Sequence, residues 1–281
     1  MIEVGVIIII QLYSGTPGSG KSLHCAHDIR FNLRLGKRVI STCAIDTKLC
    51  FLNPFQEFIY NKFGKLPKRK KPDKREKNFF YIDIKEITPD FLYEFAARYH
   101  EFGKEHQTIV YLDECVAIFS PTVIGDNKEL WNKWDDFFRK HRHLGFDCIL
   151  IPQSTKLISR KVIEYCEYEV RHYNRKHQGF LGFIFSFFAG GLFSYSTYWR
   201  GIRGKPLDSG FYTYKPLYGQ MYNSYSMFDS TLAPYKAEWE KKKALMSQLC
   251  GLLEVRKNEL QNSSAAACIA ALNTTECNTK E

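Results

Sequence analysis

The first 160 residues alternate between short uncharged runs rich in β-branched residues and longer segments with apolar positions at helical spacing. The opening run, Val4 to Ile10, is unbroken, as expected for a strand that is buried on both faces of a parallel sheet. Residues 20–35 then present one apolar helical face, and Gly36 marks the end of that helix. The apolar positions of this face are Leu23, Ala26, Ile29 and Leu33.

The same alternation continues downstream. It predicts strands over residues 79–84, 108–114 and 146–152. It also predicts a helix over residues 89–102, with Thr88 as its N-cap and Pro89 in its first position, and a second helix over residues 128–144. Strands that alternate with helices predict an α/β fold, in which a largely parallel sheet is sandwiched by helices.

Composition limits the classes of protein that this chain can belong to. With 281 residues, of which 44% are hydrophobic and 25% charged, the chain can form one main domain with appendages. Its nine cysteines include no C-x-x-C pair, which argues against a zinc site or a disulfide framework and favours a reducing cytosol. Cys43, Cys115 and Cys148 lie in strand-like runs, where a thiol behaves as a small hydrophobic group. Val4 to Ile10 is too short for the core of a signal peptide.

The net charge of +10 is concentrated in one stretch, Lys62 to Lys77. This stretch holds nine basic residues against two acidic ones, and Pro67 and Pro72 predict an exposed loop. A solvated charged loop is one interpretation. The other is attraction to the phosphates of single-stranded DNA or to an anionic membrane surface, and the sequence does not separate these two partners.

A phosphate-binding pattern follows the opening run. Residues 15–22 fit G-x-x-x-x-G-K-[ST], in which backbone N–H groups and a helix N-terminus hold the phosphates of a nucleotide such as ATP. Lys21 is expected to reach the β- and γ-phosphates, and the Ser22 hydroxyl to ligate Mg²⁺. The predicted cofactors are therefore ATP and Mg²⁺. The predicted nucleotide-binding residues are Gly15, Thr16, Pro17, Gly18, Ser19, Gly20, Lys21 and Ser22.

Two adjacent carboxylates end the run over residues 108–114. In P-loop enzymes a carboxylate at such a strand end faces the Mg²⁺ ion, and we assign this position to Asp113. We expect Glu114 to polarise the water that attacks the γ-phosphate, as a general base. Solvated turn residues are the alternative for this pair. At the end of the run over residues 146–152, Gln153 is the candidate sensor of the γ-phosphate, on a strand expected between the strands of the loop and of Asp113; a simple turn is again the alternative.

The predicted helix over residues 128–144 ends in a cluster of cationic side chains, residues 139–143. Cations in the last turn complement the helix dipole. They also allow an arginine finger that acts on the nucleotide of a neighbouring subunit, and we rank Arg142 above Arg139 for that role. Both interpretations stay open.

The order of these parts resembles the ATPases with an additional catalytic glutamate, which include ring-forming motors. More narrowly, the chain resembles the zonula occludens toxin N-terminal domain family, the ATPase of filamentous-phage assembly. The resemblance covers residues 1–230 and rests on "SGTPGSGKS", "IVYLDE", "RKHRHLGFDCILIPQS" and "YNSYSMF", the last at Tyr222 to Phe228.

The resemblance implies a P-loop ATPase on the cytoplasmic side of the host inner membrane, which acts as an oligomer with phage assembly and membrane proteins during export of a single-stranded DNA phage. The alternative function is a nucleotide-dependent binding or regulatory module, or a kinase-like transferase with little hydrolysis. Glu114 discriminates between these, because a transferase gains little from a residue that activates water.

Family members typically carry a membrane-spanning helix after the ATPase domain, whereas residues 233–281 contain no such segment. Residues 231–262 predict a polar helix, and residues 263–281 a low-complexity tail. The uncharged stretch from residue 180 to 199 is long enough for a membrane span. Its aromatic alternation around Gly190 and Gly191 favours a C-terminal β-hairpin instead, and an interfacial aromatic patch is the third possibility.

Overall fold

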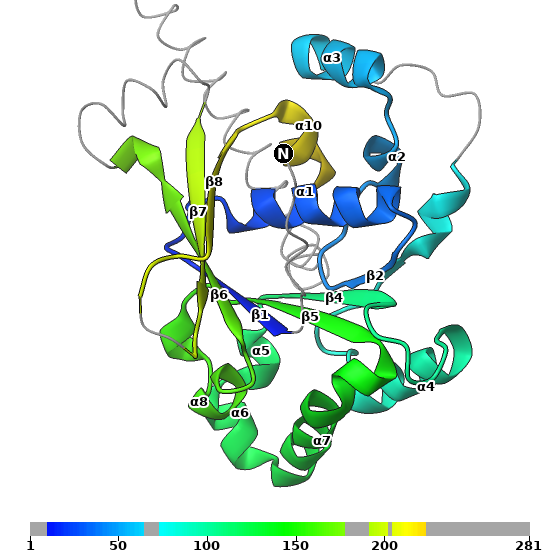
Figure 1. The fold of residues 1–281 in the computed structure, drawn as a ribbon, viewed down its shortest axis with the longest axis vertical. Helices are drawn as coiled ribbons and strands as arrows, with labels where there is room; N and C mark the ends of the chain where they lie inside the picture. The colour runs from blue at the N-terminus through cyan, green and yellow to red at the C-terminus, as the bar shows by residue number, and fades with distance from the viewer. Residues whose placement is uncertain (1–9, 65–72, 178–190, 202–203, 223–281) are drawn as a thin grey trace, which may run out of the picture. The chain divides into compact units, whose positions relative to one another are not determined.

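The computed structural model describes residues 10–64, 73–177, 191–201 and 204–222. One eight-stranded sheet runs through this part of the chain (Figure 1). All neighbouring strands from β3 to β6 are parallel to each other, whereas β7 is antiparallel to both β6 and β8. The spatial order is β3 (Phe79–Tyr81), β2 (Arg38–Ser41), β4 (Thr108–Asp113), β5 (Phe146–Ile151), β1 (Ile10–Ser14), β6 (Tyr168–Asn174), β7 (Leu192–Trp199) and β8 (Asp208–Thr213).

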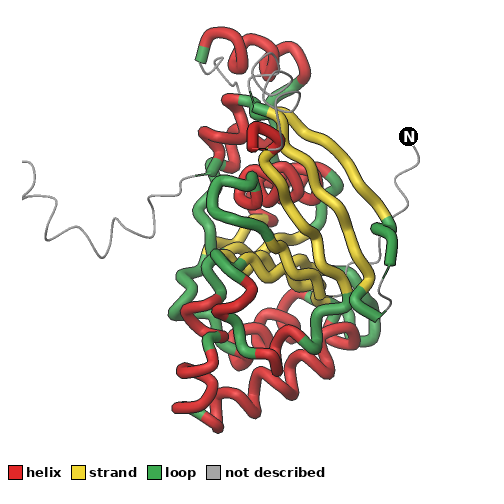
Figure 2. Tube along the Cα trace, turned by 90° about the vertical axis from the view of Figure 1, so that its left-hand side faces the viewer, coloured by secondary structure: helices red, strands yellow, loops and turns green. Residues whose placement is uncertain are grey.

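Helices cover both faces of the sheet, as the alternating pattern predicted. Figure 2 shows the same separation from the side, with helices above and below the strands. One layer contains α1 (Lys21–Arg34), α2 (Thr47–Cys50), α3 (Pro54–Phe63) and α10 (Pro216–Met221). The other contains α4 (Pro89–Tyr99), α5 (Val116–Phe119), α6 (Pro121–Asp126), α7 (Lys128–Leu144) and α8 (Arg160–Ile163), and short 3₁₀ turns lie at Lys74–Asn78, Thr155–Leu157 and Arg175–His177.

Helix ends follow the capping residues in the sequence. α7 has the predicted bounds, because the Asn127 side chain accepts from the Leu130 N–H and Gly145 adopts a left-handed conformation (φ 85°). The Thr88 side chain caps α4 as expected. This helix ends at Tyr99 rather than at residue 102, because the His100 ring turns to contact Leu144 O and Thr108 Oγ1, each at 2.6 Å.

Four predicted strands have different bounds in the structure, and β4 and β5 differ only by ending one residue earlier. β1 extends to Ser14, with every residue buried, although Gln11 and Ser14 are polar. The Ser14 hydroxyl is satisfied by Glu169 Oε1 at 2.7 Å, so the strand runs directly into the glycine loop. β3 ends at Tyr81 rather than at residue 84, because the Asp83 carboxylate accepts from the Lys85 N–H and forms a turn. Residues 4–9 of the predicted first strand lie outside the described residues.

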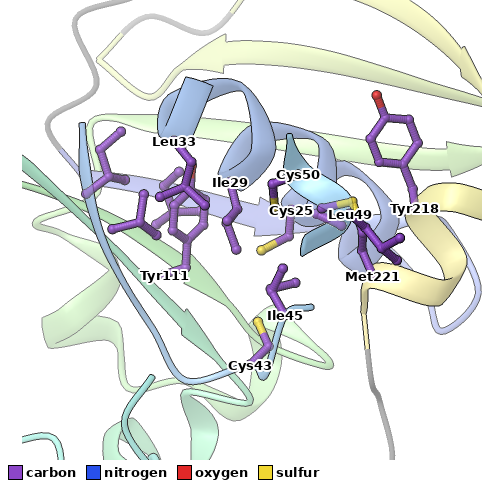
Figure 3. Packing of buried hydrophobic residues seen from close by; sticks show 14 of the residues in the cluster. Cys25, Ile29, Leu33, Cys43, Ile45, Leu49, Cys50, Tyr111, Tyr218 and Met221 are labelled. Atoms are coloured by element: carbon purple, nitrogen blue, oxygen red, sulfur yellow. The ribbon is translucent and has the colours of Figure 1, made fainter. Parts of the chain in front are cut away.

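A hydrophobic cluster joins α1 to the sheet (Figure 3). Cys25, Ile29 and Leu33 from α1 meet Tyr111 of β4, and Met221 of α10 closes the cluster. Six cysteines of the described part are free and buried, including Cys43, Cys115 and Cys148, as predicted; the others are Cys25, Cys50 and Cys166. This core fixes α1, and with it the loop that precedes α1, against the strand ends.

Several predicted segments are only partly described. Residues 192–199 form β7, and residues 180–190 of the uncharged stretch lie outside the described residues. Residues 65–72 of the basic loop, the polar helix over residues 231–262 and the tail over residues 263–281 also lie outside them. Among the described helices, none combines the length and apolarity that a membrane crossing requires.

Candidate functional site

The glycine loop connects β1 to α1. Gly15, Gly18 and Gly20 have positive φ angles of 142°, 75° and 94°. At Gly15 a Cβ atom would lie 2.6 Å from His172 O, and at Gly20 it would lie 2.7 Å from the Phe193 ring. Both positions therefore need glycine for conformation and for space, which explains the two fixed glycines of the sequence pattern.

Lys21 begins α1 and lies across the loop. Its ammonium group donates to Gly15 O at 2.7 Å and to Thr16 O at 3.3 Å. Burial lowers the pKa of Lys21, and the Asp113 charge opposes that shift. The lysine is thus positioned by the same loop whose backbone amides would hold phosphate.

Three strand ends meet in front of this loop. β5 pairs with β1 on one side and with β4 on the other, which confirms the predicted position of this strand. A cavity of about 620 Å³ opens at these ends. The sequence-predicted residues that line it are Pro17, Gly18, Ser19, Gly20, Lys21, Ser22, Asp113, Glu114 and Gln153.

Asp113 is held rigidly at the end of β4. The Thr42 hydroxyl accepts from the Asp113 N–H at 2.8 Å and donates to its carbonyl at 3.1 Å. Burial raises the pKa of Asp113, against hydrogen bonds from Tyr222 and from the Glu114 N–H that lower it. A buried carboxylate of this kind gains from a nearby cation.

Glu114 adopts a left-handed backbone conformation, with φ of 52°. Its N–H group donates to Ile151 O at 3.0 Å and to Asp113 Oδ1 at 2.9 Å. These bonds fix the turn that follows β4 against the end of β5. Positive φ at a non-glycine residue costs on the order of 1 kcal/mol and is common at functional sites. The conformation holds Glu114 beside Asp113 in the wall of the cavity.

Tyr222 contacts one of the two predicted metal ligands. Its hydroxyl donates a short hydrogen bond to Asp113 Oδ2, and Tyr222 lines the cavity together with Ser22. Burial and the Asp113 charge raise the pKa of Tyr222 far above its usual range, so the hydroxyl stays neutral. A backbone bridge to Ile45 and the Met221 carbonyl, which accepts from the Asp46 N–H, fix this end of the chain.

This geometry tests whether Mg²⁺ fits the site. Ser22 and the buried carboxylate Asp113 line the same cavity, and a hydroxyl and a carboxylate are oxygen ligands of the kind that Mg²⁺ prefers. Among the described residues, no group of three or more histidine, cysteine or acidic side chains is arranged to hold a metal ion. The P-loop type of site needs none, because phosphate and water complete the magnesium shell.

Aromatic side chains form the other wall of the cavity. Phe193 of β7 stacks on Tyr212 of β8, with centroids 5.5 Å apart, and the Tyr212 hydroxyl donates to Gly20 O at 2.9 Å. Tyr214 and Tyr218 line the same side. The Tyr218 hydroxyl accepts from Arg30 at 2.8 Å, which ties α10 to α1.

A buried polar cluster around His24 and His172 lies next to the glycine loop. His24 Nδ1 lies 2.7 Å from His172 Nε2, and His172 Nδ1 lies 3.2 Å from Ser14 O. Because a carbonyl only accepts, we assign the His172 proton to Nδ1, so its Nε2 accepts from His24. Burial lowers the pKa of both histidines, that of His172 to about 3, and Tyr13 donates to Asp28 beside them. The pair is neutral at physiological pH and anchors β6 to the glycine loop.

The family model of zonular occludens toxin (Zot) matches residues 9–189. The chain belongs to the Zot family. The Zot match includes the glycine loop, Asp113, Glu114 and Gln153, and it ends before the aromatic wall and Tyr222.

Solved structures are similar in fold. The N-terminal domain of zonular occludens toxin from Neisseria meningitidis is 17% identical, with 77% of this chain and 100% of that chain covered and a TM-score of 0.42. B204, the DNA-packaging ATPase from Sulfolobus turreted icosahedral virus, is 15% identical, with 73% and 97% covered and a TM-score of 0.42. The genome packaging NTPase B204 from Sulfolobus turreted icosahedral virus 2, in complex with ATP-gammaS, is 17% identical, with 61% and 78% covered and a TM-score of 0.34. No curated protein matches the chain.

The predicted site residues of this Zot chain do not all meet. Arg142 lies at the C-terminal end of α7, where its guanidinium contacts Glu105 Oε2 at 3.4 Å. Arg139 is bonded to Asp135 at 2.8 Å. Since α7 leads into the start of β5 and the cavity lies at the other end of that strand, neither arginine lines the cavity.

Sequence reasoning missed the C-terminal contribution to the site. Phe193, Tyr214 and Tyr218 were given no role in the site, and Tyr222 was noted only as part of a family segment. The available signal was the density of aromatic residues after residue 180, which indicated strands but not their docking beside the glycine loop.

Proposed function

We propose that this chain binds ATP with Mg²⁺ and hydrolyses it, as the motor for assembly and export of a filamentous single-stranded DNA phage at the inner membrane. The observation that carries the proposal is the meeting of the glycine loop, Asp113 and Glu114 at one cavity. Family membership and the resemblance described above support the phage-assembly role. A ring of several copies, bound to phage and membrane proteins, is part of the proposal.

The loop end of the cavity suits the triphosphate. Backbone N–H groups of the loop and the N-terminus of α1 would hold the phosphates, and Lys21 would exchange its contacts with the loop carbonyls for phosphate oxygens. Ser22 and Asp113 would hold Mg²⁺, which supplies positive charge to the transferring phosphoryl group. The Tyr222 hydroxyl has to release the Asp113 carboxylate for that to happen.

The aromatic wall suits the nucleobase. Phe193 and Tyr214 line the cavity, and Tyr214 is partly exposed. Their rings offer stacking surface, which every base can use. We therefore expect purine nucleotides other than ATP to bind as well.

Glu114 is the proposed general base, and its replacement tests the function. Glu114→Gln should keep ATP binding and lower the rate of hydrolysis by about 10²- to 10⁴-fold, because the amide cannot accept the proton of the attacking water. Phosphate release and equilibrium binding of a fluorescent ATP analogue measure the two effects separately. Asp126→Asn, outside the cavity, is the matched control.

The same variant decides between hydrolysis and the alternative function. A binding module or a kinase-like transferase gains nothing from Glu114, so it would lose no activity in Glu114→Gln. An undiminished rate of ATP hydrolysis in that variant would exclude Glu114 as the general base and favour the alternative function.

A further inference from the structure

Helix α3 presents its apolar face to solvent. Phe55, Phe58 and Phe63 are 71%, 61% and 61% exposed. Phe58 and Ile59 follow Phe55 by three and four positions, and Lys62 follows Ile59 by three. Residues at this spacing lie on one side of a helix. A surface helix normally packs such a face against the core, so α3 has the reverse arrangement.

Buried polar contacts hold α3 in this orientation. On its inner side Glu57 pairs with Arg30 at 2.8 Å and with Lys215 at 3.6 Å. The Asn61 side chain accepts from the Leu217 N–H at 3.0 Å, and Tyr60 is buried. Because contacts from α1 and α10 occupy the polar side of α3, the exposed phenylalanines lie on the opposite side of the helix.

Positive charge accompanies this apolar face. The Lys62 ammonium lies 5.8 Å from the Phe58 ring centroid and 5.6 Å from that of Phe63. In the sequence α3 leads directly into the stretch from Lys62 to Lys77, which has nine basic and two acidic residues. Protruding aromatic rings beside clustered lysines are typical of helices that lie in the interface of an anionic bilayer.

We propose that α3 is a membrane contact, which inserts the side chains of Phe55, Phe58 and Phe63 among the headgroups of anionic lipids. Single-stranded DNA would need a groove lined by stacking and cationic side chains, whereas α3 offers a convex face. The contact is independent of nucleotide hydrolysis, because none of these residues lines the cavity. It goes beyond the proposed ATPase function and does not rest on it.

Vesicle binding by the full chain tests the proposal. With vesicles of phosphatidylcholine containing about 30% phosphatidylserine, the double variant Phe55→Ser/Phe58→Ser should bind at least tenfold more weakly than the original chain, since each buried phenylalanine contributes about tenfold or more. Phe102→Ser is the matched control, because Phe102 is 92% exposed and lies outside α3. It should bind as the original chain does, and so should Lys21→Ala.

Three results would overturn the proposal. One is equal vesicle binding by the double variant and the original chain. The second is absence of vesicle binding together with self-association that the double variant abolishes, which would assign the face to a second copy. The third is loss of binding to a single-stranded oligonucleotide, but not to vesicles, in the double variant. Retained binding of the ATP analogue, and a separate Phe63→Ser variant, distinguish lost contact from lost folding.

Discussion

At the scale of single residues, the position of Tyr222 leads to a prediction about the affinity for magnesium–ATP. Its hydrogen bond to Asp113 stabilises only the form without metal, so Tyr222→Phe should raise the affinity for magnesium–ATP by about tenfold. Affinity for ATP in the presence of a chelator should stay unchanged. Titration with a fluorescent ATP analogue, with and without Mg²⁺, measures both.

Tyr218→Phe is the control for this experiment, because the Tyr218 hydroxyl bonds Arg30 and neither of the two ligands. Equal magnesium–ATP affinity in Tyr222→Phe and the original chain would mean that Tyr222 does not compete with the metal. The sequence could place Asp113 and Ser22 from local patterns, but Tyr222 is 109 positions from Asp113, and no local pattern reports such a contact.

At the scale of elements, strong local signals predicted the structure well. The apolar face and the two end residues of α7 specified its bounds, and the glycines specified the loop between β1 and α1. The sequence pattern ends the first strand at Ile10, because Gln11 and Ser14 are polar residues, whereas the folded chain buries both of them and β1 continues to Ser14.

The sequence pattern did not predict the strand pairing of the aromatic wall. It favours a hairpin within residues 180–199, with a membrane span as an alternative, whereas β7 pairs with β6 on one side and β8 on the other. Strand propensity identifies such an element, but its neighbours are chosen by packing across the sheet. The contact of Phe193 with the glycine loop is therefore a property of the folded chain.

At the scale of the whole molecule, Arg142 tests the proposed ring. The cavity and Arg142 lie at opposite ends of β5, so a finger in trans requires a head-to-tail contact between copies. Arg142→Ala and Lys21→Ala should each be inactive alone. An equal mixture should recover activity, because about a quarter of its interfaces combine an intact loop with an intact arginine.

ATP hydrolysis by the separate variants and by their mixture measures this effect. Arg139→Ala, one turn away on α7, is the matched control and should keep activity in the unmixed protein. Full activity of Arg142→Ala alone would exclude Arg142 as the finger and return the cationic cluster to its role at the end of α7.

The central claim is that the glycine loop and the end of β4 surround one metal-bound triphosphate. Electron paramagnetic resonance of Mn²⁺, used in place of Mg²⁺ with a non-hydrolysable ATP analogue, tests it most directly. One Mn²⁺ per chain should bind tightly only with the nucleotide, couple to phosphorus, and be lost in Ser22→Ala and Asp113→Ala. Tight Mn²⁺ binding that persists in both variants, or nucleotide binding with no coupled Mn²⁺, would contradict it.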